Sequence, residues 1–478
     1  MGRATFGYWL LIAINCLLVI LTLRGFYHIY AVISFPYDIT NGEGFVLRDA
    51  ALLLQGSQIY QPIEQSPFLV SNYPPLFAWL ASKIMLLTGP TFIAPRLLSA
   101  LAFIATSGLI FYLLHKKNVA LSYCIFAELL FFNSIYVYYW SAWSRVDGLA
   151  VCFSLLAIVA IEIKLNLRAV LLAALACFAA VATKQSALAA VAAIGLYLLI
   201  HDRKLLIIFL SAWASLLIPS ILWLNSSSNG EFLRHIITYN QLEWYPRVFL
   251  GQAKNFVATH FIFVLAYAWF AIKYFKREQL LLIYATIALV TTISTGRDGA
   301  STNYFIESIA ITAIIVGFIS KDLLEQPHNY RLRYAWASLI LLQLGFFAFP
   351  NIKPVSWFNK TTPDFGLNPS LADREACDQL NAHIQVAKGP ILVENPGFAV
   401  INHKDVIGNA AVLKFFRHKG WDAPVDNFIQ TIDAKAYDLI IFQGEAYDLD
   451  VLQATDRSYH EIARIDCLGE YEIKAPNR

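Results

Sequence analysis

Ionisable side chains suited to group-transfer chemistry collect in short polar segments between long apolar runs. Asp38 and Glu43 follow the first apolar run, Asp147 begins a later one, and Lys184 and Arg297 lie in two short turns. A carboxylate can take the proton from an acceptor hydroxyl group. A lysine or arginine can hold a phosphate and stabilise the negative charge that develops on it as a leaving group. These residue types predict transfer of a group from a phosphate carrier to a hydroxyl.

Each of these residues also has an ordinary structural interpretation. Asp38 and Glu43 could be solvated loop charges, and Asp147 could be a favourable acid at a helix N-terminus. Lys184 could anchor a helix end at a membrane interface by snorkelling. Arg297 could form a local ion pair with the aspartate that follows it. The functional hypothesis therefore depends on the clustering of these residues and not on any one of them.

The elements that must position these residues are membrane helices, because the composition excludes an ordinary soluble protein. Of the 478 residues, 58% are hydrophobic and 14% are charged. Soluble chains have about 45–50% apolar and about 25% charged residues. The net charge of +3 is small and the basic residues are dispersed, so no nucleic-acid partner is expected. We predict a polytopic α-helical membrane protein.

The apolar runs are long enough to cross a membrane. A hydrocarbon core about 30 Å thick needs roughly 17–25 apolar residues per helix, because no water satisfies backbone N–H and C=O groups there. The pattern predicts about eleven spans, at residues 7–33, 93–114, 119–139, 147–163, 168–183, 186–200, 204–224, 257–275, 280–294, 303–320 and 333–350. A further stretch, residues 75–87, contains Lys83, and we expect it to lie along or dip into the external face. The helix expected at residues 45–55 is amphipathic and is assigned to the same interface.

The distribution of lysine and arginine sets the orientation. With the N-terminus in the cytoplasm, the cytoplasmic loops hold groups of basic residues, such as those at 116–117 and 203–204. The short external connections hold one basic residue each. This orientation places the loops 34–92 and 225–256, together with the tail, outside the cytoplasm.

The chain changes character after the last predicted span. We divide it into a transmembrane module at residues 1–350, a linker at 351–370 and a small soluble extracytoplasmic α/β domain at 371–478. Periodicity predicts the elements of this domain as helices at 371–386 and 424–434, strands at 391–394 and 438–442, and a terminal hairpin of 459–466 and 471–475.

Two cysteines, Cys377 and Cys467, lie in the tail, and the other four lie in predicted spans. An extracytoplasmic location would permit a disulfide between them. Because the sequence does not give the distance between the two residues, the disulfide stays open, and we expect two free thiols.

Two other classes of protein compete with an enzyme. A lipid-linked glycan flippase or other transporter would carry ionisable groups near the membrane midplane and broken helices in matching halves. Here the charged groups collect at one interface, and no internal repeat is found. A non-catalytic assembly or scaffold protein with a degenerate site is the third class. The one-sided clustering favours an enzyme that acts on a lipid-linked substrate.

Several motifs resemble those of the GT-C glycosyltransferases, family-39-like members in the branch that includes the aminoarabinose transferase and the protein O-mannosyltransferases. The resemblance covers about residues 1–320 and depends on motifs in order, at residues 37–44, 47–60, 73–79, 89–100, 145–147, 182–185 and 302–304. The segments 392–397 and 437–441 resemble the appended domain of some bacterial members. The fold implied is a GT-C-like membrane module with that appended domain, in a bacterial plasma membrane.

The resemblance implies transfer of a sugar from a polyprenyl-phosphate carrier to an acceptor hydroxyl, usually with inversion. The base of the family is an acidic residue in the first external loop. Many relatives have an adjacent Asp-Glu pair, whereas Asp38 and Glu43 are separated by four residues. Both stay candidates, and Asp38 is preferred because it lies just beyond the first span. Lys184 and Arg297 resemble the phosphate-binding cations.

Other residues are expected to position the substrate or a metal. They are Asp147, Arg145, Asn303, Tyr304 and Glu394. A divalent metal is left open, because dispersed carboxylates do not define a coordination set. The expected partners are the polyprenyl-phosphate sugar, membrane lipids and an acceptor that is a glycan, a lipid or a protein.

Overall fold

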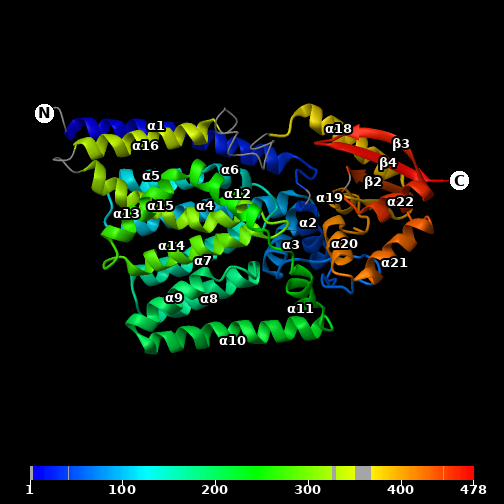
Figure 1. Cartoon of the computed structure of the whole chain (residues 1–478), viewed down its shortest axis with the longest axis horizontal. Helices are drawn as coiled ribbons and strands as arrows, with labels where there is room; N and C mark the ends of the chain where they lie inside the picture. Colours follow the sequence, from blue (N-terminus) through cyan, green and yellow to red (C-terminus); the bar gives the residue numbers. More distant parts are fainter. Residues whose placement is uncertain (1–3, 41, 326–329, 350–367, 445, 478) are drawn as a thin grey trace.

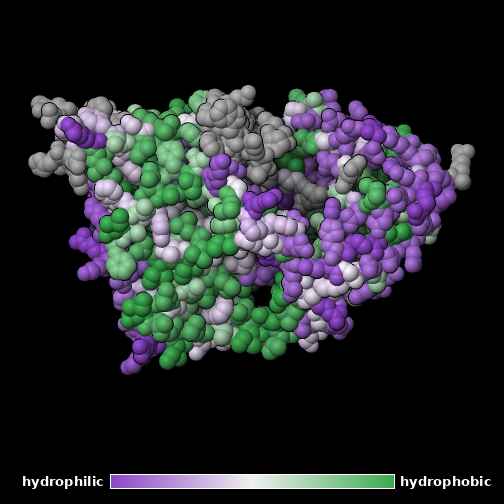
Figure 2. All heavy atoms as spheres, in the orientation of Figure 1, coloured by the Kyte–Doolittle hydropathy of each residue, from purple (hydrophilic) through white to green (hydrophobic). Residues whose placement is uncertain are grey.

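Long helices that run side by side fill one half of the molecule, and a small sheet with its helices fills the other (Figure 1). The computed structural model describes residues 4–40, 42–325, 330–349, 368–444 and 446–477. Apolar residues cover the flank of the helical half, whereas hydrophilic residues cover the half that contains the sheet (Figure 2). An apolar flank made of helices suits lipid surroundings, because each helix satisfies its own backbone. The chain is therefore an integral membrane protein with a hydrophilic extension.

Every predicted span contains helix. The bundle helices are α1 (Ala4–Ser34), α4 (Ile93–Lys116), α5 (Leu121–Phe132), α6 (Ile135–Trp140), α7 (Asp147–Ile163), α8 (Leu167–Thr183), α9 (Ala189–His201), α10 (Arg203–Ser227), α13 (Phe261–Lys273), α14 (Gln279–Thr291), α15 (Ile306–Leu324) and α16 (Tyr330–Ala348). The predicted run 119–139 is divided between α5 and α6. The centre of the bundle is α15, whose residues are almost all buried.

Five described helical segments are long and apolar enough to cross a membrane, and α12 (Pro246–Thr259) with α13 forms a sixth candidate, bent by 87°. Helices such as α8 and α9 are apolar but shorter. The polytopic helical architecture is thus confirmed, and the number of about eleven crossings stays a prediction.

The connections that hold most of the predicted site residues lie at the end of the bundle that faces the sheet (Figure 1). The first of them forms α2 (Glu43–Leu54) and α3 (Leu76–Thr88), which pack against each other. Another forms α11 (Glu231–Ile236) and the 3-10 turn η1 (Thr238–Asn240), which precede α12. The 3-10 turns η2 (Thr292–Gly296) and η3 (Thr302–Phe305) lie on either side of Arg297. Short elements therefore surround the polar site.

The C-terminal region is built on a four-stranded sheet in the order β1-β2-β4-β3. Its strands are β1 (Ile391–Val393), β2 (Leu439–Gln443), β3 (Tyr459–Asp466) and β4 (Glu470–Pro476). β1 and β2 are parallel, and β4 pairs antiparallel with both β2 and β3. The helices are α18 (Leu371–Val386), α19 (Gly397–Ile401), α20 (Ala410–His418), α21 (Asp422–Asp433) and α22 (Leu449–Ser458). The predicted elements are found within a few residues, whereas α19, α20 and α22 were not predicted. Most of the predicted linker 351–370 lies outside the described residues.

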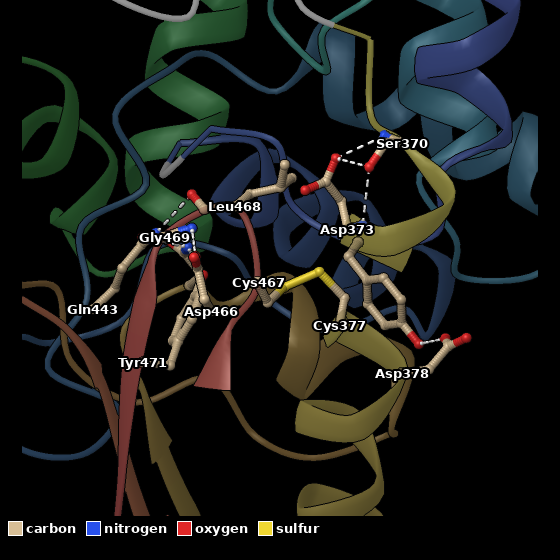
Figure 3. Close-up of a disulfide and its surroundings, with 12 residues drawn as sticks. Ser370, Asp373, Cys377, Asp378, Gln443, Asp466, Cys467, Leu468, Gly469 and Tyr471 are labelled. Carbon is tan, nitrogen blue, oxygen red and sulfur yellow. Dashed lines mark hydrogen bonds between the residues drawn. A yellow bond between two sulfur atoms is a disulfide. The ribbon is translucent and has the colours of Figure 1, made fainter. Parts of the chain in front are cut away.

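Cys377 of α18 and Cys467 of the hairpin form a disulfide, with their Cα atoms 4.8 Å apart (Figure 3). The expectation of two free thiols is therefore wrong. The two residues are 90 positions apart, and only the packing of α18 against β3 brings them together.

The C-terminal region shares a hydrophobic core with the connection between α1 and α4. Tyr37, just beyond α1, stacks on Phe398 of α19 with ring centroids 5.1 Å apart. Both rings are buried in a cluster that also contains Leu47, Cys377 and Ile391. The C-terminal region is therefore packed directly on the segment that holds Asp38 and Glu43.

Candidate active site

Glu43, at the start of α2, is fully buried in an ion pair with Arg96 of α4. The Nε and Nη2 groups of Arg96 donate to the two carboxylate oxygens, both at 2.9 Å. The backbone N–H groups of Ser144 and Ile39 also donate to this carboxylate, at 2.7 and 3.1 Å. Burial raises the pKa of Glu43, but Arg96 and these N–H groups together hold it below its ordinary value. Both carboxylate oxygens are thus occupied by protein donors.

Arg96 was not among the predicted site residues. It is fully buried, and its Nη groups also donate to the carbonyl oxygens of Val32, Phe35 and Tyr37. An arginine near the start of an apolar run was the available signal, because a buried charge requires a partner. Arg96 holds the end of α1 and the segment just before Asp38 in a defined conformation.

Asp38 is buried but is not saturated. Its two carboxylate oxygens lie beside the backbone N–H groups of Gly44 in α2 and Gly397 in α19, which lower its pKa. Neither contact has the geometry of a full hydrogen bond, and the oxygens have no other partner among the described residues. A Cβ atom on Gly44 would lie 2.6 Å from Asp38 Oδ1, and a Cβ on Gly397 would collide with Oδ2. Both glycines are needed for this close approach.

Burial raises the pKa of Asp38 to about 8, and the negative charge of Glu43 adds to this rise. Arg96 and the two glycine N–H groups oppose it. Asp38 is therefore largely protonated at neutral pH while the C-terminal region covers it. A pKa near the working pH is a common property of general bases.

A second cluster lies at the adjoining ends of α7, α8 and α15. The Nζ group of Lys184 donates to Asp147 Oδ1 at 2.6 Å, and Asn303 Nδ2 donates to the same oxygen at 2.8 Å. Lys184 Nζ also lies 4.0 Å from the ring centroid of Tyr304. The other oxygen of Asp147 is buried without a hydrogen-bond partner among the described residues. Four of the predicted residues therefore form one contact network.

Two adjoining cavities open beside this network. The larger, about 510 Å³, is lined by Lys184, Gln185, Asn240, Arg297 and Tyr304 together with neighbouring loop residues. The smaller, about 80 Å³, shares Lys184 and Tyr304 and extends between α7, α14 and α15 to Glu307. Asp38 lines neither cavity.

Arg297 is half-buried and its guanidinium donates to the carbonyl oxygen of Asn240. Its backbone pairs with Trp244 in an isolated bridge, which joins the turn to the connection between α10 and α12. Arg297 and Lys184 thus line one cavity from different elements, as phosphate-binding cations would.

Arg145 connects the two halves of the site. Its Nη2 group donates to Thr40 Oγ1 at 3.2 Å, in the segment between Asp38 and Glu43. Two residues further along the chain, Asp147 joins the cavity network. The turn that contains Arg145 therefore sets the position of one cluster relative to the other.

The remaining predicted residue, Glu394, directly follows β1 and lines neither cavity. It accepts a hydrogen bond from the backbone N–H of Gln443 at 2.8 Å. Burial raises its pKa to about 7. Among the residues that the structure describes, no group of three or more His, Cys, Asp or Glu side chains is placed to hold a metal ion.

The fold described above, a helix bundle with a polar site at one end that is covered by a small α/β region, is similar to that of solved membrane-protein structures. ArnT from Cupriavidus metallidurans bound to undecaprenyl phosphate is similar to this chain with a TM-score of 0.63 and 13% identity, over 95% of this chain and 97% of that one. The oligosaccharyltransferase from Archaeoglobus fulgidus, tethered with an acceptor peptide, has a TM-score of 0.51 and 13% identity, over 98% of this chain and 74% of that one. The archaeal enzyme in complex with an inhibitory peptide and a dolichol-phosphate has a TM-score of 0.51 and 12% identity, over 99% of this chain and 74% of that one. No protein-family model matches the chain, and no curated protein matches it by sequence. At these identities the likeness establishes the fold.

Proposed function

We propose that this protein is a membrane glycosyltransferase that moves a sugar from a polyprenyl-phosphate donor to an acceptor hydroxyl at the external face of the membrane. The observation that carries this proposal is the cavity lined by Lys184 and Arg297 at one end of a GT-C bundle. Solved structures with this fold hold undecaprenyl phosphate and dolichol-phosphate, which supports a lipid phosphate as the carrier.

The donor phosphate would lie in this cavity between the two cations. Lysine and arginine bind phosphate oxygens through charge-assisted hydrogen bonds. They also stabilise the additional negative charge that the phosphate gains when the sugar leaves. Asp147 would hold Lys184 in place through their ion pair. Asn303 would support this arrangement because it donates to the same oxygen of Asp147.

Asp38 is our choice for the base. The acceptor oxygen would attack C1 of the sugar, the bond from C1 to the phosphate oxygen would break, and Asp38 would take the hydroxyl proton. A single displacement of this kind inverts the configuration at C1. Glu43 is less suited to this step because four protein donors already occupy its carboxylate. We assign to it, with Arg96, the task of positioning Asp38.

Gly397 covers Asp38, so the proposed reaction requires α19 to separate from α2. The acceptor would enter along this boundary. The external location of the site is part of the proposal, and the Cys377–Cys467 disulfide supports it because disulfides persist in oxidising compartments.

The test is a transfer assay with the purified full-length protein, a panel of polyprenyl-phosphate sugars and a membrane-glycan extract. We expect one donor to yield a glycosylated product of inverted configuration together with free polyprenyl phosphate. Lys184→Met should weaken binding of undecaprenyl phosphate by about tenfold to a hundredfold, since a hydrogen bond to a charged group contributes roughly 1.5–3 kcal/mol. Lys254→Met, an exposed lysine of α12, is the matched control.

Intact donor with every acceptor would contradict the enzyme proposal. Movement of the lipid-linked sugar across a liposome membrane, without covalent change, would then identify a flippase. Equal loss of binding in the Lys184 and Lys254 variants would contradict the assignment of the phosphate to this cavity.

A further inference from the structure

A separate polar cavity of about 390 Å³ lies between α2 and the C-terminal region. Most of its walls come from α2 and the loop after it, and from α19 and the segment that follows α19. Its volume is within the range of ligand-binding pockets, about 300–1,000 Å³. None of its lining residues belongs to the cavities beside Lys184. It is therefore distinct from the proposed donor site.

The most buried polar side chain of this cavity is Arg48, which is 7% exposed. Its Nη1 group donates to Asp49 Oδ1 at 3.0 Å and contacts Ser71 Oγ at 3.4 Å. The opposite edge of the guanidinium, Nε and Nη2, has no hydrogen-bond partner among the described residues, and neither atom is sealed from solvent. Asp49 therefore orients the arginine while one complete edge stays available.

An available Nε–Nη2 edge is suited to a planar or tetrahedral anion. Two parallel N–H groups match two oxygens of a carboxylate or a phosphate, as Arg96 and Glu43 illustrate elsewhere in this protein. The other polar residues that line the cavity are Gln55, Gln61, Ser66, His403, Lys404 and Asp405. Such side chains can donate to and accept from sugar hydroxyl groups.

The position of the cavity relates it to Asp38. Gly44, which touches Asp38, and Arg48 are four residues apart in α2 and so lie one turn apart on the same face. On the opposite wall, Gly397 touches Asp38 and Val400 lines the cavity, both within α19. The boundary between α2 and α19 thus extends from the proposed base to the Arg48 cavity.

We infer that the Arg48 cavity binds an anionic saccharide, with a carboxylate or phosphate substituent on the Nε–Nη2 edge of Arg48 and sugar hydroxyls on the surrounding polar side chains. The identification of this saccharide as part of the acceptor rests on the proposed function. The binding itself does not require transfer, so the two can fail separately.

The first experiment measures binding to the full-length protein in detergent, without donor. The probes are mannose 6-phosphate, galacturonic acid, mannose and inorganic phosphate. We expect the two anionic sugars to bind at least tenfold more tightly than mannose, and mannose 6-phosphate to bind more tightly than inorganic phosphate. Equal binding of mannose, equal binding of inorganic phosphate, or no binding of either anionic sugar would overturn the inference.

Variants identify the cavity that binds the anionic sugars. The double substitution Arg48→Gln with Asp49→Asn removes the cation without leaving a buried carboxylate unpaired, and it should abolish the preference for anionic sugars. Lys184→Met should leave that preference unchanged. The reverse result would assign the sugar to the donor cavity and overturn the inference.

A milder pair of variants guards against misfolding. Gln55→Glu places a negative charge on an exposed residue of the cavity and should weaken binding of both anionic sugars by about tenfold. Gln385→Glu, an exposed residue of α18 outside the cavity, is the matched control and should have no effect. Equal effects of the two would overturn the inference. Binding that depends on Arg48, with no transfer to any acceptor, would support the saccharide site and contradict its role in the proposed reaction.

Discussion

The two halves of the candidate site differ in how far they are already open. Around Lys184 and Arg297 the protein leaves a cavity of about 510 Å³, and the cations face it from separate elements. Asp38 and Glu43 are themselves buried under the C-terminal region, with Asp38 only 3% exposed, and neither lines the cavity of about 610 Å³ that adjoins Ile39 and Thr40. The difference indicates that a phosphate site can be preformed, whereas access for the acceptor requires movement.

A second contrast lies within the closed half. Glu43 is occupied by Arg96 and two backbone donors, whereas the equally buried Asp38 has no well-formed hydrogen bond among the described residues. A saturated carboxylate stabilises the fold, and an unsaturated one retains the capacity to accept a proton.

Asp38→Asn should reduce the transfer rate by about 10²–10⁴-fold, which is the usual contribution of a general base. The thermal unfolding temperature in detergent should not fall, because the substitution removes a buried group that lacks good partners. Initial rates and melting curves measure the two effects. Asp456→Asn, an exposed residue of the C-terminal region, is the control. A transfer rate in the Asp38 variant equal to that of the unmodified protein would contradict the assignment of Asp38, rather than Glu43, as the base.

Arg96→Met should destabilise the protein by about 3–5 kcal/mol, because Glu43 is left as an unpaired buried charge. The double variant with Glu43→Gln should regain part of this stability. The stability of the single and the double variant would be measured by unfolding in detergent, with the accessibility of buried cysteines as the signal. If the double variant were no more stable than the single one, Glu43 would not be the partner that makes Arg96 necessary.

Replacing Cys377 and Cys467 together with alanine should destabilise the C-terminal region by about 2–4 kcal/mol, since the bridge closes a long loop in the unfolded chain. Binding of undecaprenyl phosphate should be unaffected, because the cavity beside Lys184 does not use this region. Hydrogen exchange measures the stability of the C-terminal region, and a binding assay measures the affinity for undecaprenyl phosphate. Cys16→Ala, an exposed free cysteine, is the control. A parallel loss of stability and of undecaprenyl phosphate binding would show that the C-terminal region and the cavity beside Lys184 are not independent.

The transfer rate should rise as the pH increases towards about 8, because deprotonated Asp38 is the active form and its pKa is about 8. Between pH 3.8, the ordinary pKa of an aspartate, and about pH 8, Asp38 holds a proton in the closed state, whereas an exposed carboxylate has lost it. Raising the pH through this range therefore favours opening. Glu43→Gln should move the rate profile to lower pH, since it removes a neighbouring negative charge. A profile with no dependence between pH 6 and 8 would contradict the role of Asp38.

The helical membrane architecture could be predicted because hydropathy is a property of short segments. The same holds for α18 and the terminal hairpin, whose periodicity is evident within each segment. Lys184, Asp147 and Asn303 could be grouped because all three lie at the same end of predicted spans. α20 and α22 have clear apolar faces but are short, and short helices are easily missed in a segment between strands.

The amino-acid sequence alone determined the class of integral membrane protein, the common end of the predicted spans at which Lys184, Asp147 and Asn303 lie, and the secondary structure of much of the tail. Only the tertiary structure decided that Glu43 pairs with Arg96, that Cys377 bonds to Cys467, and that Gly397 closes over Asp38. The physical reason is that span and strand patterns arise from neighbouring residues. Whether a carboxylate is saturated or available depends on groups that the fold brings together from distant parts of the chain.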